Sequence, residues 1–404
     1  MSHRKLKGDY LFTGSRLLHG VNVLIVETDS GEVIEIVHEN EAGENVEIYD
    51  GIICPGFINA HCHLELSHLK GVIPEHTGLV DFVLNIIALR NYSPDVILDS
   101  LSKAEEEMRS NGIVAVGDIC NNALTVSPKM KDRINYYNFI EVSGWVPQGA
   151  SMRFNHARTV YDEFLKNELC ASMVPHAPYS VCDELWAELN SSFTNKVVTI
   201  HNQETIHEDS LFLRGKGDFI RMFEKMDIDI SFYKAPNKRS LEVYFKNLSP
   251  AKSVILVHNT FTTAEDIEFI NANKPAQQLV SFCLCPNANL YIEDTMPPVK
   301  LLLENNCRII LGTDSLASNH QLNILEEMKT IANHCPEIPL ETMLSWATLN
   351  GAQALNMDTV LGSFDIGKTP GVTVINNIEN GKITTESKAI NLLNAGKIMN
   401  EQLS

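Results

Sequence analysis

The chain has 404 residues, of which 44% are hydrophobic and 21% charged, a balance typical of a globular soluble protein. Its formal net charge of −19 argues against a nucleic-acid partner, because phosphate binding needs clustered Lys and Arg, and mildly favours a neutral or cationic small substrate. No apolar run approaches the roughly 18 residues of a membrane helix, and the nine cysteines follow no disulfide framework, so we expect a cytoplasmic protein with reduced thiols and no membrane partner.

The first 54 residues are expected to form short strands joined by turns. Gly, Asp and Asn separate β-prone runs at 10–12, 22–27, 32–38 and 45–49. No amphipathic run of helical length precedes residue 79. Residues 358–404 return to short strands and turns, so we predict a small β-sandwich domain formed from segments 1–54 and 358–404.

The segment Ile53–Ser67, ICPGFINAHCHLELS, carries two histidines one residue apart. In an extended strand, residues i and i+2 point to the same side, so the imidazoles of His61 and His63 face one point. Two neutral imidazoles at a rigid strand end are good ligands for a borderline-soft cation, zinc first among them. Alone, this pattern is weak evidence for a metal site, because paired histidines on a strand are more often ordinary polar residues.

Residues 55–357 alternate between apolar β-rich runs and helical stretches. Strands buried on both faces read as continuous apolar runs, and alternation with helices implies parallel βαβ units. Including the strand before His61, about eight strands occur over some 300 residues, which is the size of a (β/α)8 TIM barrel. A doubly wound open sheet is the alternative, but no Gly-x-Gly-x-x-Gly turn supports it. We therefore predict an α/β fold with a barrel at 55–357.

The expected strands and helices of this region have the following limits. Apolar strands are predicted at 113–119, 134–142, 169–174, 197–200, 253–257, 278–284 and 308–311. Helices are predicted at 79–90, 94–110, 183–191, 205–225, 263–273, 298–306, 321–334 and 340–355.

Polar residues recur where the predicted strands end. Barrel active sites lie at the carboxyl ends of the strands, so these side chains would surround one opening together with the histidine pair. Five strand ends that each deliver a His or Asp are hard to explain by packing and favour a metal site. The residues that follow the later strands are His176, His201, Glu204, His258 and Asp314.

These motifs resemble those of the amidohydrolase superfamily, in the aminohydrolase branch that includes guanine deaminase, S-adenosylhomocysteine deaminase and the triazine hydrolases. The resemblance covers nearly the whole chain and is carried by PGFINAHCH, PHAPYS, TIHNQET, VHN and LGTDSLASN. It implies one divalent ion, Zn2+ or Fe2+, held by His61, His63, His201 and Asp314. The fourth strand ends MVPHAPYS without the Lys or Glu of binuclear members, which implies a mononuclear site.

The residue types indicate how such a site would work. Three histidines and a carboxylate leave a coordination position open for water, whose pKa the ion lowers towards roughly 7. His258 and Asp314 are placed to orient and deprotonate this water, and Glu204 can carry a proton to a ring nitrogen. The alternatives are a carboxylate that satisfies a helix N-terminus for Glu204 and a structural strand-end histidine for His258.

The leading hypothesis is a metal-dependent hydrolytic deaminase, in which metal-bound hydroxide attacks a ring carbon and ammonia leaves. The substrate would be an amino-substituted nitrogen heterocycle, namely a purine, a pterin or a purine nucleoside. HCHLELS is similar to the aminodeoxyfutalosine deaminases. Two alternatives stay open, namely hydrolysis of a cyclic amide or of a ring halide or thioether at the same site, and a non-catalytic metal-binding scaffold protein.

Five residues are predicted to contact the small-molecule heterocyclic substrate. By resemblance, His176 faces the pocket, while Asn287 and Asn289 shape its edge. Glu65 and Glu141 are candidate acceptors for substrate N–H or hydroxyl groups, with a solvated loop carboxylate as the alternative for each. The long stretch 65–83 is a candidate mobile loop over the site. Homodimers are common in the branch that the chain resembles, which makes a homodimer a candidate assembly.

Overall fold

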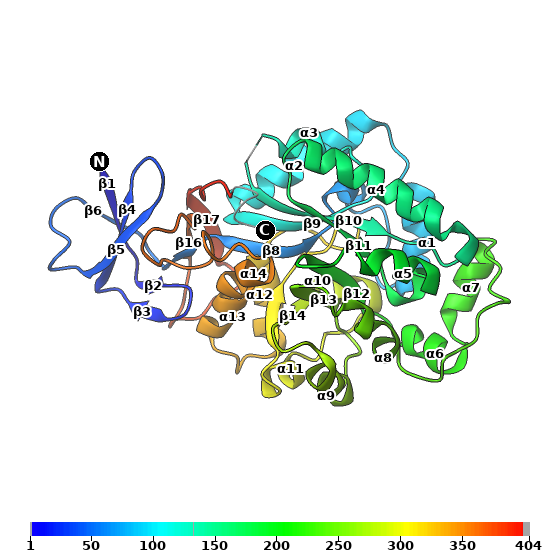
Figure 1. Cartoon of the computed structure of the whole chain (residues 1–404). Coiled ribbons are helices and arrows are strands. Elements are labelled where there is room, and N and C mark those ends of the chain that lie inside the picture. Colours follow the sequence, from blue (N-terminus) through cyan, green and yellow to red (C-terminus); the bar gives the residue numbers. More distant parts are fainter. Residues whose placement is uncertain (1, 132, 399–404) are drawn as a thin grey trace.

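The molecule combines a small all-strand part with a larger part in which strands and helices alternate (Figure 1). The computed structural model describes residues 2–131 and 133–398. The predicted mixed α/β class is confirmed. The last six residues of the predicted C-terminal segment, 399–404, lie outside the described residues.

Strands from both ends of the chain build the small part. They are β1 (His3–Lys7), β2 (Tyr10–Phe12), β3 (Leu17–His19), β4 (Asn22–Glu27), β5 (Val33–His38), β6 (Val46–Ile48), β7 (Ile52–Pro55), β16 (Val372–Asn376) and β17 (Lys388–Leu393). One sheet has the order β5-β4-β1-β6 and the other β17-β16-β7-β2-β3. Because β16 pairs antiparallel with both β17 and β7, the C-terminal strands complete an N-terminal sheet. Leu6, Leu24, Ile53 and Val374 of the two sheets share one buried cluster.

The larger part contains two four-stranded parallel sheets. Their strands are β8 (Phe57–Cys62), β9 (Ile113–Cys120), β10 (Asn135–Val142), β11 (Ala171–Pro175), β12 (Val197–Asn202), β13 (Ser253–His258), β14 (Leu279–Leu284) and β15 (Arg308–Leu311). The orders are β11-β10-β9-β8 and β12-β13-β14-β15. Cys62 forms a parallel bridge with Asp314, and the His201 N–H donates to the His176 carbonyl at 3.0 Å. The carboxyl ends of both sheets therefore face the same way.

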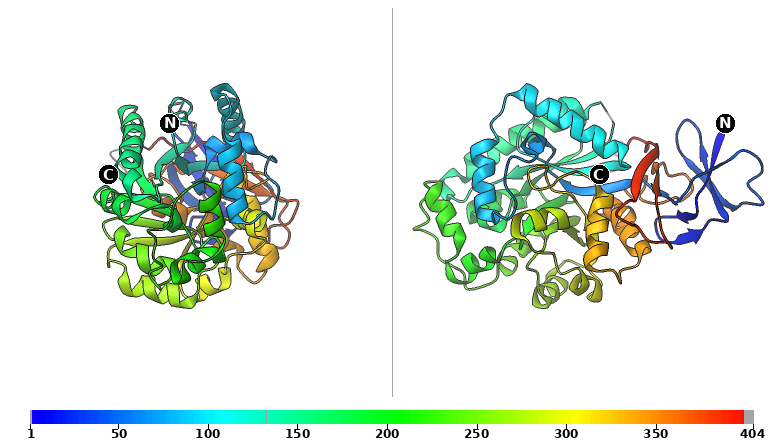
Figure 2. Two further views of the ribbon diagram at one scale, coloured as in Figure 1. Left: turned by 90° about the vertical axis from the view of Figure 1, so that its right-hand side faces the viewer. Right: turned by 180° about the vertical axis from the view of Figure 1, so that it is seen from behind.

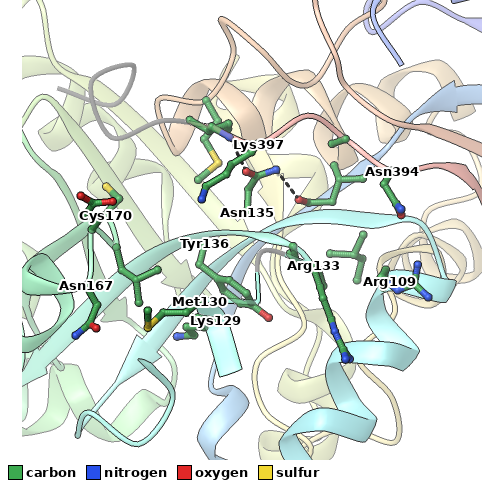
Figure 3. Close-up of a pocket in the computed structure, with 18 residues that line it drawn as sticks. Arg109, Lys129, Met130, Arg133, Asn135, Tyr136, Asn167, Cys170, Asn394 and Lys397 are labelled. Atoms are coloured by element: carbon green, nitrogen blue, oxygen red, sulfur yellow. Dashed lines mark hydrogen bonds between the residues drawn. The ribbon is translucent and has the colours of Figure 1, made fainter. Parts of the chain in front are cut away.

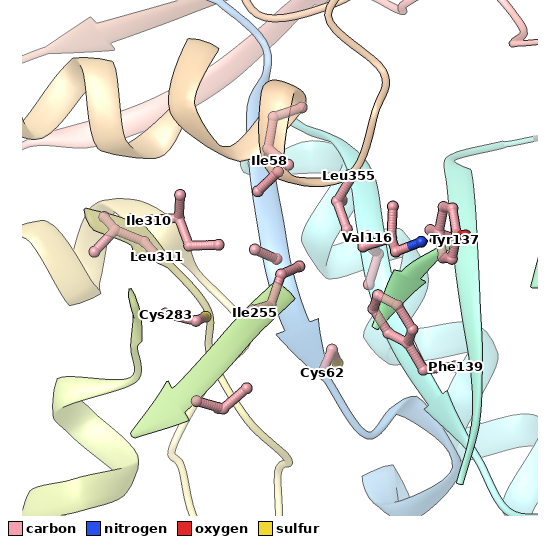
Figure 4. Close-up of a cluster of buried hydrophobic side chains, with 14 of the residues drawn as sticks. Ile58, Cys62, Val116, Tyr137, Phe139, Ile255, Cys283, Ile310, Leu311 and Leu355 are labelled. Atoms are coloured by element: carbon pink, nitrogen blue, oxygen red, sulfur yellow. Dashed lines mark hydrogen bonds between the residues drawn. The ribbon is translucent and has the colours of Figure 1, made fainter. Parts of the chain in front are cut away.

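Apolar side chains pack between the two parallel sheets (Figure 4). Cys62, Phe139, Ile255 and Leu311 come from four different strands or their ends, and all four have no exposed surface. Strands β8, β9, β12 and β13 are buried at every residue. Burial on both faces explains why the sequence shows continuous apolar runs instead of alternation.

Helices lie outside the parallel strands (Figure 2). They are α1 (Leu79–Leu89), α2 (Pro94–Ser110), α3 (Val126–Lys129), α4 (Ala150–Lys166), α5 (Asp183–Asn190), α6 (Ile206–Arg214), α7 (Asp218–Lys225), α8 (Ser240–Tyr244), α9 (Ala264–Asn273), α10 (Pro286–Glu293), α11 (Val299–Glu304), α12 (Ile324–His334), α13 (Leu340–Ala347) and α14 (Leu349–Ala354). No helix in the described part of the chain combines the length and the apolar character needed to cross a membrane.

The structure divides two predicted helices, 205–225 into α6 and α7 and 340–355 into α13 and α14, and it adds α3, α4, α8 and α10, which were not predicted. The stretch 205–225 forms two helices, because Gly215 caps α6 with a left-handed φ of 61° and stops it. Helix α4 was not predicted, although it is one of the two longest. Its buried residues are only Ala150, Ala157, Val160 and Phe164, so most of its surface is polar and its apolar stripe is narrow.

Replacing Phe139 by alanine tests the packed interior. Phe139 is completely buried on β10, so Phe139→Ala should lower the free energy of unfolding by about 3–5 kcal/mol through lost burial and a residual cavity. Urea denaturation followed by circular dichroism measures the change. Met152 on α4 is 68% exposed, and Met152→Ala should stay within about 0.5 kcal/mol. Equal losses in the two variants would contradict the assignment of Phe139 to the core.

Candidate metal centre and active site

Five of the predicted site residues meet at the carboxyl edge of the parallel strands. His61 lies in β8, His201 in β12 and His258 in β13, whereas His63 directly follows β8 and Asp314 lies three residues after the end of β15. All five are buried, and the most open of them, His63, is only 9% exposed. Parallel strands thus bring together side chains from distant parts of the sequence, as the strand-end pattern indicated.

Three imidazoles and one carboxylate present their ligand atoms to a common space. The Asp314 Oδ1 atom lies 3.6 Å from His61 Nε2 and 3.4 Å from His63 Nε2. The Nε2 atoms of His63 and His201 are 3.2 Å apart. Both ring nitrogens of His61 are buried without a hydrogen-bond partner, although buried polar groups are normally satisfied. This donor set fits a divalent metal ion, which would satisfy all four groups.

Neighbouring groups orient these ligands. The His201 Nδ1 atom is 2.8 Å from the His176 carbonyl oxygen, so Nδ1 donates the hydrogen bond and Nε2 keeps a free lone pair. The Ser318 hydroxyl donates to Asp314 Oδ2 at 2.5 Å, which leaves Oδ1 towards the histidines. At Gly312 a Cβ atom would lie 2.9 Å from the His61 Cβ. A side chain at this position would push the loop that carries Asp314 away from β8.

Burial and mutual contact set the charges of the cluster. Burial is the main cause that lowers the pKa of His63, and it lowers the pKa of His201 well below its ordinary value. Burial would raise the pKa of Asp314, but contacts with His61 and His63 and the proximity of His258 lower it well below the ordinary value. Neutral imidazoles beside an ionised carboxylate are the protonation states that metal binding requires.

Glu204 lies beside the cluster. It is 4% exposed, and its Oε1 atom is 3.5 Å from His258 Nε2. Burial, and secondarily the Asp314 charge, raises the pKa of Glu204 well above its ordinary value. Burial also lowers the pKa of His258 to about 3, with His61 and His63 adding to the effect and Asp314 opposing it. A carboxyl group whose pKa is raised therefore faces an imidazole whose pKa is lowered, an arrangement that suits an acid and a base in proton transfer.

Two of these side chains stand on strained backbone. His258 has a φ of 73° and Asp314 a φ of 56°, a left-handed conformation that costs a non-glycine residue roughly 1–3 kcal/mol. The Asn259 N–H donates to the Asn202 carbonyl at 3.0 Å, and the two side-chain amides are joined by a second bond of 3.0 Å. The Asp314 N–H donates to the His61 carbonyl at 3.1 Å. These bonds hold the conformation that aims both side chains at the cluster.

A cavity of about 180 Å³ opens onto the cluster. Its polar wall carries Glu204 together with His63, His201, His258 and Asp314 of the cluster. The facing wall is α1, which contributes Leu79, Phe82 and Ile86. Arg90, at the end of α1, and Asn121 also line it and were not predicted. The sequence could have predicted this wall. Helix α1 reads LVDFVLNIIAL and is largely apolar, and such an outer helix is expected to make contacts on more than one side.

Two of the five predicted substrate contacts line the cavity, His176 and Glu141. His176 is oriented by a 2.7 Å hydrogen bond between its Nδ1 and the Ser180 hydroxyl. Glu141 Oε2 accepts from the Asn121 side chain at 3.3 Å, whereas Oε1 is buried without a hydrogen-bond partner, 3.8 Å from His201 Nδ1. A buried oxygen with free acceptor capacity is a suitable partner for a donor group on a ligand.

The other three predicted contacts do not line this cavity. Glu65 accepts from Arg90 at 3.0 Å and from the Asn121 N–H at 3.1 Å, so it supports lining residues from behind. The Asn287 side chain donates to Glu327 at 3.1 Å, and the Asn289 side chain donates to the Thr260 hydroxyl. A direct role of Glu65, Asn287 and Asn289 in substrate binding stays a prediction.

A larger cavity, of about 570 Å³, lies at the opposite ends of β9, β10 and β11 (Figure 3). Arg109, Arg133, Asn135 and Tyr136 are among its lining residues. Within the described residues, every group of His, Cys, Asp and Glu side chains able to hold a metal includes instead His61 or His201 of the buried cluster. Cavity size therefore does not identify the active site, whereas the chemistry of the lining does.

Nearly the whole chain, including this site, matches a known family. The model of the amidohydrolase family matches residues 52–398. The chain belongs to the amidohydrolase family. It is 24% identical over 400 residues to a 5-methylthioadenosine/S-adenosylhomocysteine deaminase of Caldanaerobacter subterraneus subsp. tengcongensis, a match that covers 89% of this chain and 81% of the relative. The resemblance predicted from the motifs is confirmed, and the protein is a hydrolase of carbon–nitrogen bonds.

Two solved structures have the same fold. Helicobacter pylori aminofutalosine deaminase in complex with methylthio-coformycin has a TM-score of 0.80 and 19% sequence identity, over 96% of this chain and 97% of that one. An adenosine deaminase from Xanthomonas campestris with bound zinc has a TM-score of 0.69 and 21% identity, over 92% and 84%. At such identities the agreement concerns the fold of this amidohydrolase.

Removing one ligand tests the metal centre. His201→Ala deletes an Nε2 donor of the cluster, so stoichiometric zinc binding should be lost. Zinc should also no longer raise the melting temperature, since only a bound ion stabilises the folded state. Elemental analysis after dialysis and thermal unfolding measure both effects. His334 lies exposed at the end of α12, and His334→Ala should bind zinc like the wild type. Equal zinc contents in all three proteins would contradict the site.

Proposed function

We propose that this amidohydrolase is a metal-dependent hydrolytic deaminase of an amino-substituted nitrogen heterocycle, with purine nucleosides as the favoured class. One observation carries the proposal, namely the buried Glu204 carboxyl with a raised pKa beside the neutral His258 imidazole, both lining the cavity at the ligand cluster. The relative named for its action on two adenosine derivatives supports the purine nucleoside class. Aminodeoxyfutalosine and pterins are further candidates.

The cofactor we propose is one divalent ion, Zn2+ first and Fe2+ second. His61, His63, His201 and Asp314 would hold it. When bound, such an ion polarises a water and lowers its pKa, so that a nucleophile is available at neutral pH. The unsatisfied nitrogens of His61 and the 3.2 Å approach of the His63 and His201 nitrogens support this ligand set.

Three side chains of the protein would carry out the proton transfers. His258 and Asp314 orient the attacking water and take up its proton. Glu204 donates its proton to the ring nitrogen next to the amino-bearing carbon, which makes that carbon more electrophilic. When the tetrahedral centre collapses, the amino group gains the proton taken up by His258 and Asp314, its C–N bond breaks and ammonia leaves. The proton of the new hydroxyl group passes to Glu204, which restores the acid, and a ring carbonyl replaces the amine. Water and the aminoheterocycle are consumed in equal amounts.

Substrate orientation is proposed to come from the two walls of the cavity. His176 would hydrogen-bond the heterocycle, and the free Glu141 Oε1 would accept from a ring N–H or a sugar hydroxyl. The apolar face of α1 would cover the ring and exclude water. The same architecture also permits hydrolysis of a cyclic amide, ring halide or thioether, but a proton-donating Glu204 favours deamination. A non-catalytic metal-binding scaffold has no use for this acid.

The architecture we propose for this function is a closed (β/α)8 barrel at 55–357 and a β-sandwich domain made of 1–54 and 358–404. The Cys62–Asp314 bridge and the bond of 2.7 Å from the Ser172 hydroxyl to the Val197 carbonyl support contact along both seams between the parallel sheets.

The nine cysteines are unpaired, which supports a reducing compartment such as the cytoplasm. A homodimer remains a candidate assembly.

Glu204→Gln separates acid catalysis from metal binding. The amide keeps the shape of the side chain but cannot donate the carboxyl proton, so kcat should fall by about 10²–10⁴-fold while zinc content stays unchanged. Steady-state ammonia release and elemental analysis measure the two quantities. Full activity of the Gln variant would exclude Glu204 as the proton donor.

Ammonia release also tests the reaction itself. Zinc-loaded protein should release ammonia from one group in a panel of aminopurines, aminopterins, their nucleosides and aminodeoxyfutalosine, and chelation should stop the release. The panel is followed with a glutamate dehydrogenase-coupled assay. If no compound releases ammonia although zinc is bound stoichiometrically, deamination is the wrong reaction, and cyclic amides are the next substrates to test.

A further inference from the structure

A completely buried ion pair lies next to the histidine pair of β8. Lys129 ends α3 and Asp118 lies in β9, and neither side chain has exposed surface. The Lys129 Nζ atom is 2.5 Å from Asp118 Oδ2, 2.7 Å from Asn138 Oδ1 and 3.2 Å from Cys120 Sγ. Figure 3 shows Lys129 beside Tyr136, whose ring centroid is 4.9 Å from Nζ. The ammonium group is therefore enclosed by oxygen, sulfur and an aromatic face.

Stability alone is a poor explanation for this pair. Transferring two charges out of water is costly, and replacing a buried ion pair by apolar residues of similar volume is often neutral or stabilising. Besides its polar contacts, the Lys129 ammonium group lies against the rings of Tyr136 and Phe164, which would pack around an apolar side chain as well. The charged groups are therefore better explained by a neighbouring segment that they hold in place.

The backbone of β8 is irregular where it carries the histidines. Asn59 pairs with Val116, and Cys62 pairs with Asp118, so three residue steps on β8 oppose two on β9. The extra residue forms a bulge that includes His61 and turns the strand end. Gly117 permits the close approach of β9 here, because a Cβ atom would lie 2.5 Å from the Ala60 carbonyl oxygen. A bulged strand end needs other contacts to fix its direction.

Asp118 supplies such a contact. Its Oδ1 atom accepts a hydrogen bond of 2.8 Å from the backbone N–H of Leu64, the residue directly after His63. Its other oxygen, Oδ2, is held by Lys129. One residue further on, the Glu65 carboxylate accepts from the Asn121 N–H at 3.1 Å, so the chain after β8 is tied to β9 and its following loop twice.

We propose that the Lys129–Asp118 pair is a positioning device for the His61–His63 metal ligands. Asp118 fixes the backbone on the far side of His63, and Lys129 keeps the Asp118 carboxylate oriented inside the apolar interior. Lys129 lies outside the catalytic cavity and is not a ligand. The inference rests on the metal centre proposed above and adds two residues that no motif of the ligand set contains.

Zinc affinity and thermal stability, measured on the same variants, test the proposal. Lys129→Met removes the charge that holds Asp118, and Asp118→Asn removes the charged acceptor while preserving its shape. Loss of an orienting partner typically weakens metal affinity by about 10–100-fold, and this loss is expected for both variants. Competition with a chromophoric chelator gives the zinc dissociation constant, and calorimetry of the metal-free proteins gives the melting temperature.

Tyr136→Phe is the matched control. It deletes a buried hydrogen bond of 2.9 Å to Glu105 but keeps the aromatic ring near Lys129 and leaves the Leu64 contact in place. Its melting temperature should fall while its zinc affinity stays at the wild-type value. Should Lys129→Met not fold, Lys129→Gln retains a donor to Asp118 and is expected to weaken zinc binding less than Asp118→Asn.

The double variant Lys129→Met/Asp118→Asn provides an independent readout. If the two residues act as one unit, its loss of zinc affinity should be smaller than the product of the two single losses. Wild-type zinc affinity in Lys129→Met and Asp118→Asn, with lowered melting temperatures, would overturn the positioning role and leave the metal centre standing. Absence of zinc binding by the wild-type protein would overturn the metal centre and this inference together.

Discussion

The contact between the Asp314 carboxylate and the buried imidazoles is the interaction on which the whole site depends. Its Oδ1 atom lies within 3.6 Å of ring nitrogens of His61 and His63, although Asp314 is far from both histidines in the sequence. Such a cluster, taken out of water, is expensive unless its charges and lone pairs are matched. A divalent cation matches them all, so the geometry of the protein and the chemistry of the family lead to the same conclusion.

Much of this arrangement can be read from the sequence, because it follows from parallel strands. Continuous apolar runs predicted strands at 197–200 and 253–257, and the observed strands β12 and β13 extend only two residues and one residue further, so that they include His201 and His258. Once the strands are parallel, residues at their carboxyl ends must share one edge. Thus the five buried residues of the cluster were predicted from their place in the chain, before any contact was known.

The walls of the cavity could not be predicted in the same way. Glu65 lies two residues after His63, and its sequence position suggests that it faces the substrate, yet it is turned towards Arg90 and Asn121. Such directions depend on helix α1 and on loop packing, which no strand periodicity encodes. Helix α4 was missed for a related reason, since a polar helix with a narrow apolar stripe leaves only a weak pattern.

Buried carboxylates behind the site explain how its irregular backbone is maintained. Asp118 accepts from the N–H of Leu64, and Glu208 accepts from the N–H of Gln203 at 3.1 Å, next to Glu204. Glu327 accepts from the N–H of Asn287 at 3.0 Å and from the Asn319 side chain at 2.8 Å in the loop after Asp314. Each lies directly behind a segment where the regular ladder of hydrogen bonds has ended.

These three buried carboxyl groups avoid adding net charge near the site in two different ways. Burial, partly offset by the hydrogen bonds they accept, raises the pKa of Glu208 and of Glu327 to about 8, so both can accept bonds as neutral acids at neutral pH. Asp118 instead has its own ammonium partner, Lys129. A neutral acid adds no further charge near the ligand cluster, and a paired carboxylate adds none in sum. The protein can therefore hold three bends of its backbone with carboxyl groups that add little net charge beside Asp314 and the candidate ligand histidines.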